Sequence, residues 1–255
     1  MDFETIRYEV DAGLCRLTLD RPDHMNAMTN QMVRETFDAL TAAATDASIR
    51  VLLLTGAGRA FCPGADLHHF TSGGPDEVLT AREFEVTTLL HELPAVTVAA
   101  INGACAGAGM GWALACDLRV MTASAKLNTA FLDVAVAGDM AIPWSLPRIV
   151  GSARARDLSF IPRRIEADEA ERIGLVARVF DDDTFRDQTG ALVVALLEKS
   201  PTALFGLKHN YLAAERMPIG DFVAYEAERH LDIAASADTA EAFRAFVEKR
   251  KPVFR

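Results

Sequence analysis

The sequence predicts a mixed α/β fold, with parallel strands in its first part and an all-helical C-terminal part. Three observations lead to this prediction. Short strand-like runs alternate with helical periodicity in the first half of the chain, and such alternation is typical of parallel pairing. Helical patterns dominate the remainder. The chain has 255 residues, of which 50% are hydrophobic, so it is long enough to bury a substantial core.

The first elements that we expect are a hairpin, a helix and a buried strand. "IRYEV" and "LCRLTL" are short alternating runs separated by "DAG", which predicts an N-terminal β-hairpin. Helical periodicity with a polar start follows from Thr29. "VLLLTG", from Val51 to Gly56, is a short apolar run that ends in glycine, and this pattern predicts a buried strand.

The central and C-terminal elements follow in the same way. "SGGPDE" predicts a turn in a mobile loop, and residues 76–92 predict a helix that Pro94 ends. "AVTVAAING" and "DLRVMTA" predict two more strands, on either side of a helix at "AGMGWALAC". The later segments predict helices: "ADEAERIG", "TFRDQTGALVVALLEKS", "FVAYEAERHLDIAAS" and "DTAEAFRAFVEKRKP".

Charge and cysteine content exclude several classes of protein. The formal net charge of −10 argues against a broad nucleic-acid surface and against an anionic membrane as partner. The four cysteines lie far apart without metal-ligand spacing, so we expect no metal and four reduced, buried thiols. The charged N-terminus does not resemble a signal peptide, and no apolar run reaches the roughly 18 residues of a membrane helix. We therefore expect a cytoplasmic protein.

Two segments have the order strand, glycine-rich turn, helix. They are "TGAGRAFCPGADLHHF" and "AINGACAGAGMGW". Such turns direct free backbone N–H groups into one space, and two of these groups that converge on one oxygen form an oxyanion hole. The alternative is close packing of a helix on a sheet through small residues. A phosphate loop is less favoured, because neither segment contains GxxxxGK[ST] or a GxGxxG turn of the required form.

Together these segments closely resemble the crotonase, or enoyl-CoA hydratase/isomerase, superfamily. "RPDHMNAM", "LPRIVG" and "SADTAEAFRAFVEKRKPVF" also fit, so the resemblance covers nearly the whole chain. It implies a spiral of ββα units over residues 1–195 and a helical trimerisation region over 196–255. It also implies an acyl-CoA thioester as substrate, no separate cofactor because coenzyme A is part of that substrate, and a homotrimer or a hexamer.

The resemblance assigns the oxyanion N–H groups to Ala65 and Ala108. Hydratases of this family also use two glutamates, with which they add water across an enoyl-CoA. In this chain Gly111 stands at the first glutamate position and Phe131 at the second, so both glutamates are absent. The motifs are closest to the epoxyphenylacetyl-CoA isomerases, which also lack both. The chain departs from that branch at Gly138, where proline is common, and at "AIPW", where a glycine-rich turn is usual.

Asp139 is the candidate acid/base, because it lies where several family isomerases and a dehalogenase branch carry a catalytic aspartate. A single carboxylate can remove a proton and return it elsewhere, as moving a double bond requires. Apolar neighbours would raise its pKa from about 3.9 toward a useful range. The expected neighbours are Val134, Val136, Met140, Phe131 and Trp144. The alternative is that Asp139 caps the helix at "MAIPWSL"; Asp133 is a weaker candidate.

Further residues are expected to contact the substrate. The resemblance places backbone contacts at Asp23 and Met25 and assigns Phe246 and Lys249 to the CoA site, often across a subunit boundary; a solvated helix end is the alternative for the lysine. Asp66 and Asp117 are interpreted as structural. His68 and His69 border the pocket or are solvated. The complete predicted substrate-binding set is Asp23, Met25, Ala65, Asp66, Leu67, His68, Ala108, Phe131, Trp144, Phe246 and Lys249.

Three functional hypotheses follow. The first is an acyl-CoA isomerase that uses Asp139. The second is a hydratase or thioester hydrolase that uses Asp139 and a positioned water. The third is an acyl-CoA-binding protein without catalysis, motivated by the loss of both glutamates.

Overall fold

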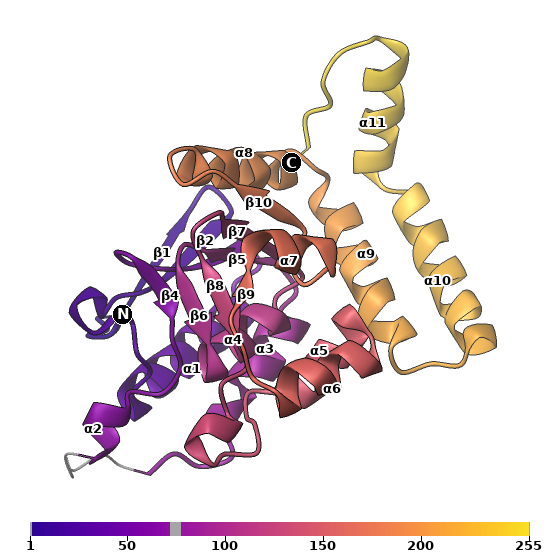
Figure 1. Cartoon of the computed structure of the whole chain (residues 1–255). Coiled ribbons are helices and arrows are strands. Elements are labelled where there is room, and N and C mark those ends of the chain that lie inside the picture. Colours follow the sequence, from indigo (N-terminus) through magenta and orange to yellow (C-terminus); the bar gives the residue numbers. More distant parts are fainter. Residues whose placement is uncertain (1, 72–77, 255) are drawn as a thin grey trace.

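A twisted sheet of six strands forms the centre of the described chain (Figure 1). The computed structural model describes residues 2–71 and 78–254. The strand order is β1-β2-β3-β5-β7-β10; β1 and β2 form the expected antiparallel hairpin, and every other pairing in this sheet is parallel. The strands are β1 (Ile6–Asp11), β2 (Leu14–Leu19), β3 (Val51–Gly56), β5 (Val96–Ile101), β7 (Leu118–Thr122) and β10 (Arg178–Phe180).

A second, smaller sheet contains strands that the sequence pattern did not predict. Its order is β4-β6-β8-β9, with β4, β6 and β8 parallel and β9 antiparallel to β8. Strands of two or three residues are too short to show alternation, so their sequence carries no period. They are β4 (Ala60–Cys62), β6 (Ala104–Ala106), β8 (Lys126–Asn128) and β9 (Ile165–Glu166).

The chain visits both sheets in turn. β3 is followed by β4, β5 by β6, and β7 by β8, and a helical segment follows each pair. The fold is therefore a spiral of ββα units, which confirms the expected fold class. The long helices are α1 (Asn30–Thr45), α3 (Val86–Glu92), α4 (Gly107–Ala115), α5 (Ile142–Val150), α6 (Ser152–Phe160), α8 (Phe185–Leu197), α9 (Pro201–Ala214), α10 (Ile219–Ala234) and α11 (Ala237–Val247). The short ones are η1 (Pro22–His24), α2 (Leu67–Thr71), η2 (Glu83–Glu85), η3 (Leu132–Val134) and α7 (Ala167–Arg172).

The helix expected over 76–92 starts later than predicted. Within its described residues, regular α-helix covers only Val86–Glu92, after the 3-10 turn Glu83–Glu85. The Glu83 carboxylate accepts hydrogen bonds from the backbone N–H and the hydroxyl of Thr80, each at 2.7 Å, and this local arrangement starts the helical segment at residue 83. The predicted turn "SGGPDE" lies outside the described residues.

The core has two parts, on the two faces of the larger sheet. One lies between the larger sheet, the smaller sheet and helices α1, α3, α4 and α5. The other lies between the opposite face and α8, where Val51, Val98 and Val120 pack with Val193. β5 is buried on both faces, and its sequence is accordingly apolar at every position except Thr97 rather than alternating.

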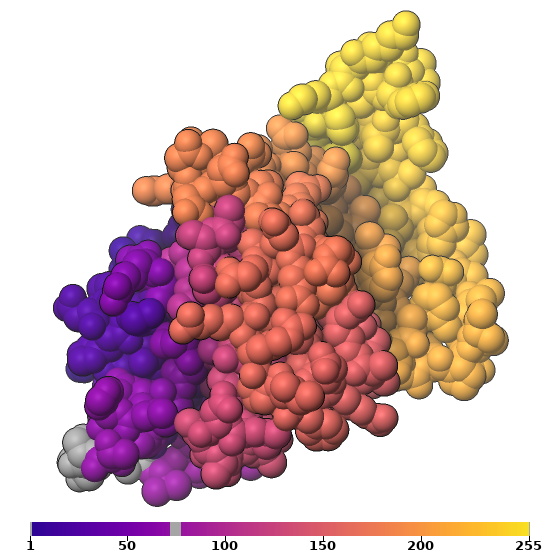
Figure 2. Space-filling view, viewed as in Figure 1, coloured from indigo at the N-terminus to yellow at the C-terminus, as the bar shows by residue number. Residues whose placement is uncertain are grey.

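The C-terminal helices extend away from this core (Figures 1 and 2). α9 is attached to it by the buried Lys208, whose ammonium donates to the Ala95 carbonyl oxygen at 2.9 Å and pairs with Asp117 at 2.8 Å. The expected structural role of Asp117 thus has a geometric basis. α10, by contrast, has no buried residue against the described chain. Large apolar side chains are exposed on these helices: Leu207, Tyr211, Ile219, Val223, Leu231, Phe243, Phe246 and Val247.

The described helices were also compared with the dimensions of a bilayer. Taken singly, none of them is long and apolar enough to cross it. α8 and α9 meet the criterion only as a pair, and they are bent by 99° relative to each other. The expected cytoplasmic location stays a prediction.

Candidate active site

The first glycine-rich turn follows β4 and presents the backbone of Ala65. Gly64 has φ +103°, a conformation that glycine adopts without a steric penalty. Met28 forms hydrogen bonds with the two residues that flank Ala65. Its N–H donates to Gly64 O at 2.8 Å, and its carbonyl oxygen accepts from Asp66 N–H at 2.9 Å. Successive N–H groups point to opposite sides of an extended chain, so the N–H of Ala65 points away from Met28.

The second turn follows β6 and leads into α4. Gly107 has φ +49° and Ala108 is already helical, so the alanine methyl group causes no backbone strain. Ala108 lies in the first turn of α4, where N–H groups have no intrahelical acceptor. The residue before the helix, Ala106, has only a methyl side chain and cannot cap these N–H groups. The N–H of Ala108 is therefore in the position from which helices bind anions.

The two turns lie against each other. β4 and β6 are parallel neighbours, and a Cβ atom added to Gly64 would lie 3.2 Å from Ala106 O and 3.6 Å from Gly107 Cα. Two residues after Gly107, a Cβ atom at Gly109 would lie only 2.3 Å from Cys62 O. The small residues thus permit helix–sheet packing, which was the alternative interpretation of these turns. The same packing brings the Ala65 and Ala108 turns together, so the two interpretations are compatible.

Asp139 is a half-buried carboxyl group close to these turns. Its Oδ1 atom is buried and has no hydrogen-bond partner among the described residues. Burial raises the pKa of Asp139 above its usual value, because it penalises the charged form. Burial also raises the pKa of the Cys62 thiol to about 12, and the nearby charge of Asp139 adds to that rise. Asp139 is therefore close enough to the end of β4 for its charge to act on Cys62.

The interpretation of Asp139 as a helix cap is wrong. The residue before α5 is Ala141, with φ +55°, and its methyl side chain cannot accept a hydrogen bond. Asp139 interacts with this helix only through its backbone carbonyl oxygen, which accepts from the N–H of Ile142 at 3.1 Å. The side-chain carboxyl group of Asp139 therefore does not cap α5.

Neither position that corresponds to a family glutamate offers a carboxylate or open space. A Cβ atom at Gly111 would lie 2.5 Å from Met140 Cβ and 2.6 Å from Met140 O, so Met140 already occupies that space. The Phe131 ring lies between the second turn and Asp139. It is 3.9 Å from the Cβ positions of both Gly107 and Gly138.

Only part of the expected apolar surroundings of Asp139 is present in the described chain. Met140 is 4% exposed, and Phe131 is half-buried against the core. Val134 and Val136 are exposed. Trp144 contacts His91 edge-on at 5.1 Å and carries the Arg148 guanidinium over its ring at 3.9 Å. It lines a pocket between α3, α5 and the residues that follow α9, which Ala141 also borders but neither glycine-rich turn does. The structure therefore does not bring Trp144 together with the two turns.

The predicted N-terminal contact residues lie in a turn held by buried polar groups. Asp23 is in η1, and Met25 follows it with φ +54°. The buried Asn26 accepts from Arg21 N–H at 2.9 Å and donates to Ala57 O and Ala60 O, so this turn is bound to the strand that leads to Ala65. Asn26 was not predicted from the sequence; the signal that it offers is an asparagine within the turn "RPDHMNA", since asparagine side chains often hydrogen-bond turn backbone.

Asp66 has the expected structural role. Its side chain pairs with Arg21 at 3.0 Å and accepts from His69 N–H at 3.1 Å, which caps the start of α2. Burial alone would raise the pKa of Asp66, but these two donors outweigh it and hold the pKa below its usual value. Its neighbours Leu67 and His68 are exposed on α2 and border the same turn.

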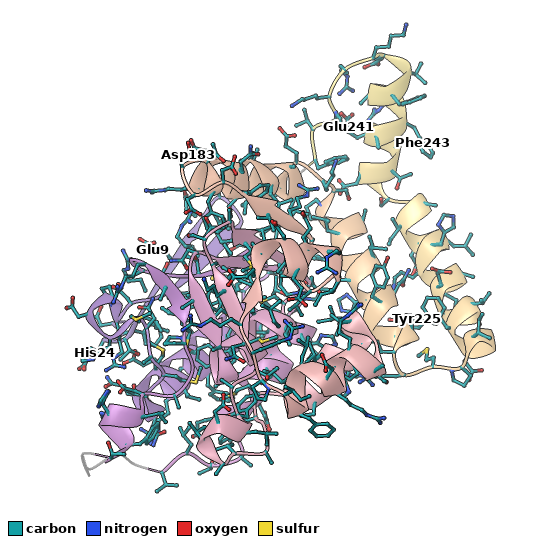
Figure 3. All side chains as sticks on the ribbon, viewed as in Figure 1. Glu9, His24, Asp183, Tyr225, Glu241 and Phe243 are labelled. Carbon is teal, nitrogen blue, oxygen red and sulfur yellow. The ribbon has the colours of Figure 1, made fainter. Side chains whose placement is uncertain are left out.

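Phe246 and Lys249 lie far from these groups within one chain. Both are exposed, Phe246 near the end of α11 and Lys249 just after it. Figure 3 shows His24, next to Asp23, and Phe243, on α11, on opposite sides of the molecule. A single chain therefore does not bring the two predicted CoA-contact regions together. Across residues 2–71 and 78–254, no group of three or more His, Cys, Asp or Glu side chains is arranged to hold a metal ion.

Comparisons with known proteins agree on one family. The family model described as enoyl-CoA hydratase/isomerase matches residues 9–255. A protein named "Probable enoyl-CoA hydratase" from Rhodobacter capsulatus is 38% identical, with 100% of this chain and 99% of the relative covered. The 1,2-epoxyphenylacetyl-CoA isomerase of Escherichia coli is 34% identical, with 98% of each covered. The crystal structure of an enoyl-CoA hydratase from Bacillus anthracis matches with a TM-score of 0.91 at 27% identity, covering 98% of this chain and 99% of that one.

Proposed function

Because the chain belongs to the enoyl-CoA hydratase/isomerase family, we propose that it is an isomerase that moves a double bond within an unsaturated acyl-CoA thioester. Asp139 is the single acid/base of this reaction, and the backbone N–H groups of Ala65 and Ala108 stabilise the enolate. The observation that carries the proposal is the unpartnered, buried carboxyl oxygen of Asp139 beside two adjoining turns that present free N–H groups.

The proposed reaction needs only one carboxylate. The Asp139 carboxylate removes a proton from a carbon of the acyl chain, and the electron pair of the broken C–H bond moves toward the thioester oxygen. The Ala65 and Ala108 N–H groups donate to that oxygen while it carries negative charge. Asp139, now protonated, returns the proton to a different carbon, which restores the thioester and the carboxylate. The raised pKa of Asp139 favours this role, because a base whose pKa is nearer the working pH transfers protons more efficiently.

The lack of an acid/base at either glutamate position of the described chain favours isomerisation over hydration. Water addition requires a group that activates the water in addition to one that handles the substrate proton. The filled space at Gly111 and the ring of Phe131 supply no such group. Hydration is nevertheless the second candidate, because the relative at 38% identity carries a hydratase name.

A panel of acyl-CoA thioesters analysed by mass spectrometry tests this proposal. An isomerase leaves the mass of the thioester unchanged while its spectrum or retention shifts, hydration adds one water, and hydrolysis releases free CoA. Asp139→Asn should abolish turnover and leave thioester binding intact. Asp133→Asn is the matched control, because Asp133 is an exposed carboxylate six residues away. Water addition, CoA release or full activity of Asp139→Asn would overturn the proposal, and binding without any turnover would indicate a non-catalytic binding protein.

We also propose that residues 196–255 assemble copies of the chain into a trimer or a dimer of trimers. The exposed apolar side chains of α9 to α11 support an interface there, since monomers rarely expose such a contiguous surface. Phe246 and Lys249 would then contact CoA bound to a neighbouring copy. Light scattering after size exclusion measures the assembly, and Phe246→Ala should weaken CoA-thioester binding. A monomeric wild-type protein would contradict this assignment.

A further inference from the structure

Residues 138–141 form a turn with an unusual backbone. Gly138 has φ +101°, Met140 has φ +44° and Ala141 has φ +55°. For residues with a side chain, this left-handed region costs roughly 1–2 kcal/mol each. Asp139 lies inside this turn, so the position of its carboxyl group depends on whatever holds Met140 and Ala141 in that conformation.

The side chain of Met140 is held by two helices. Met140 is 4% exposed, and its Sδ atom accepts from Trp112 Nε1–H at 3.3 Å. The Thr87 hydroxyl lies 3.7 Å from the same sulfur and 3.3 Å from Phe84 O, so its one proton is shared between these two acceptors. Trp112 is fully buried on α4, and Thr87 is buried on α3. A thioether is a weak acceptor, but the indole donor and the close packing of Trp112 and Thr87 around the sulfur fix the direction of the side chain.

The backbone of Met140 packs against Gly111 on helix α4, where the lack of a side chain leaves room for it. Gly111 directly precedes Trp112 on α4. A Cβ atom at Gly111 would lie 2.5 Å from Met140 Cβ and 2.6 Å from Met140 O, which real contacts do not allow. Two adjacent residues of α4 thus contact Met140. Gly111 leaves space for its backbone, and Trp112 donates a hydrogen bond to its sulfur.

The side chain of Asp139 has no comparable anchor, although its backbone carbonyl oxygen accepts from Ile142 N–H at 3.1 Å. Its Oδ1 atom lacks a hydrogen-bond partner among the described residues, so side-chain hydrogen bonding does not fix this oxygen. The backbone on its N-terminal side is the flexible Gly138, whereas the backbone on its C-terminal side is the fixed Met140. The position of the carboxyl group is therefore set mainly from the Met140 side.

We infer that Met140 is a positioning residue for Asp139 and that Gly111 and Trp112 form the seat that holds it. This rests on the proposed acid/base role of Asp139. In this arrangement glycine at position 111 is a requirement of the site rather than only the loss of a glutamate. The seat determines where Asp139 can reach along the acyl chain, since a misplacement of about 1 Å can cost a factor on the order of a hundred in rate.

Met140→Leu tests the inference, because it keeps the apolar volume and removes the sulfur acceptor. We expect kcat to fall about 10- to 100-fold, with KM within about twofold and the apparent pKa on the acid limb of kcat/KM displaced. Met32→Leu is the matched control: Met32 is equally buried but lies on α1. Its kinetics should match the wild type. A Met140→Leu protein with the kcat and pH profile of the control would overturn the inference.

Two further variants keep the test decisive if Met140→Leu folds poorly. Thr87→Val removes the hydroxyl that lies beside both the sulfur and Phe84 O without changing side-chain shape, and we expect a smaller fall in kcat, about two- to fivefold. Gly111→Ala pushes on the Met140 backbone. Its effect should be non-additive with that of Met140→Leu, since the two residues touch. Independent, additive effects or an unchanged kcat in Thr87→Val would contradict the seat.

The two proposals fail in different ways. If Asp139→Asn keeps full activity, the proposed function is wrong whatever Met140 does. If Asp139→Asn is inactive while the Met140 and Thr87 variants behave like Met32→Leu, the proposed function stands and only the positioning role is wrong. The test applies to any Asp139-dependent reaction that the thioester panel detects.

Discussion

The two glycine-rich turns and the 138–141 turn place functional groups by opposite means. In the first pair, glycines adopt the positive φ angles, and the group presented is the backbone itself. In the 138–141 turn, Met140 and Ala141 adopt positive φ angles despite their side chains, and the group presented is the carboxyl of Asp139. A turn of the first kind is inexpensive and is visible in the sequence. A turn of the second kind depends on contacts with distant residues.

The largest effect should come from the carboxyl group. Asp139→Asn should reduce kcat by about 10²- to 10⁴-fold, the usual contribution of a general acid/base. In the wild type, activity should fall toward acid pH with an apparent pKa above that of an ordinary aspartate, because burial raises the pKa of Asp139 and only the carboxylate accepts a proton. A pH profile of kcat/KM measures this limb. Finding the same limb in the residual activity of Asp139→Asn would assign it to another group.

A somewhat smaller effect should come from the backbone of the second turn. Ala108→Pro removes one N–H in the first turn of α4, where proline is tolerated, and should lower kcat about 10²- to 10³-fold. Ser152→Pro is the matched control, because Ser152 also follows a glycine and opens a helix, α6. The control should keep its activity. Circular dichroism separates a lost donor from a lost helix, and full activity of a folded Ala108→Pro protein would exclude Ala108 as a donor.

Stability should respond to packing at the first pair of turns. Gly109→Ala places a Cβ atom 2.3 Å from Cys62 O, and overpacking against backbone costs roughly 3 kcal/mol. Gly190→Ala is its control on α8, where nothing lies within 4 Å; it should stabilise the chain by up to about 1 kcal/mol through helix propensity. Denaturant unfolding measures both. Equal stabilities would mean that the contact between α4 and β4 relaxes without cost.

The smallest effect is a gain in stability. The pKa of Asp139 is raised in the folded state, so its contribution to stability is fully present below the unfolded pKa and is lost as pH rises through the folded pKa. Asp139→Asn should therefore be more stable than the wild type at pH 7, and the difference should vanish at acid pH. Thermal unfolding at several pH values measures it. A destabilised variant at pH 7 would show that the charged carboxylate has a partner.

This comparison also explains what the sequence could predict. The turns at Gly64 and Gly107 were located correctly because glycine marks a positive φ angle locally. The seat of Met140 was not predicted, because it joins Thr87, Gly111 and Trp112, which are distant from it along the chain. A methionine in a loop carries no signal for such contacts.

Errors about the remaining elements have similar causes. The strands of the smaller sheet are too short to have a detectable period. Trp144 was expected near Asp139 because it is close in the sequence, but α5 turns its side chain toward His91 and Arg148. The roles assigned to Ala65, Ala108, Asp139, Phe246 and Lys249 remain predictions until substrate is bound or turned over.

The space shared by Gly111 and Met140 also constrains the order in which mutations can accumulate. A glutamate introduced at position 111 would collide with the backbone of Met140 before it could act on any substrate. Residues 138–141 would have to withdraw first, and that step would disturb Asp139 before a second carboxylate was available. On the proposed function, a glutamate added at position 111 alone would therefore lower activity by displacing Met140 and Asp139. Engineering a hydratase from this chain should begin with the 138–141 turn and add the carboxylate last.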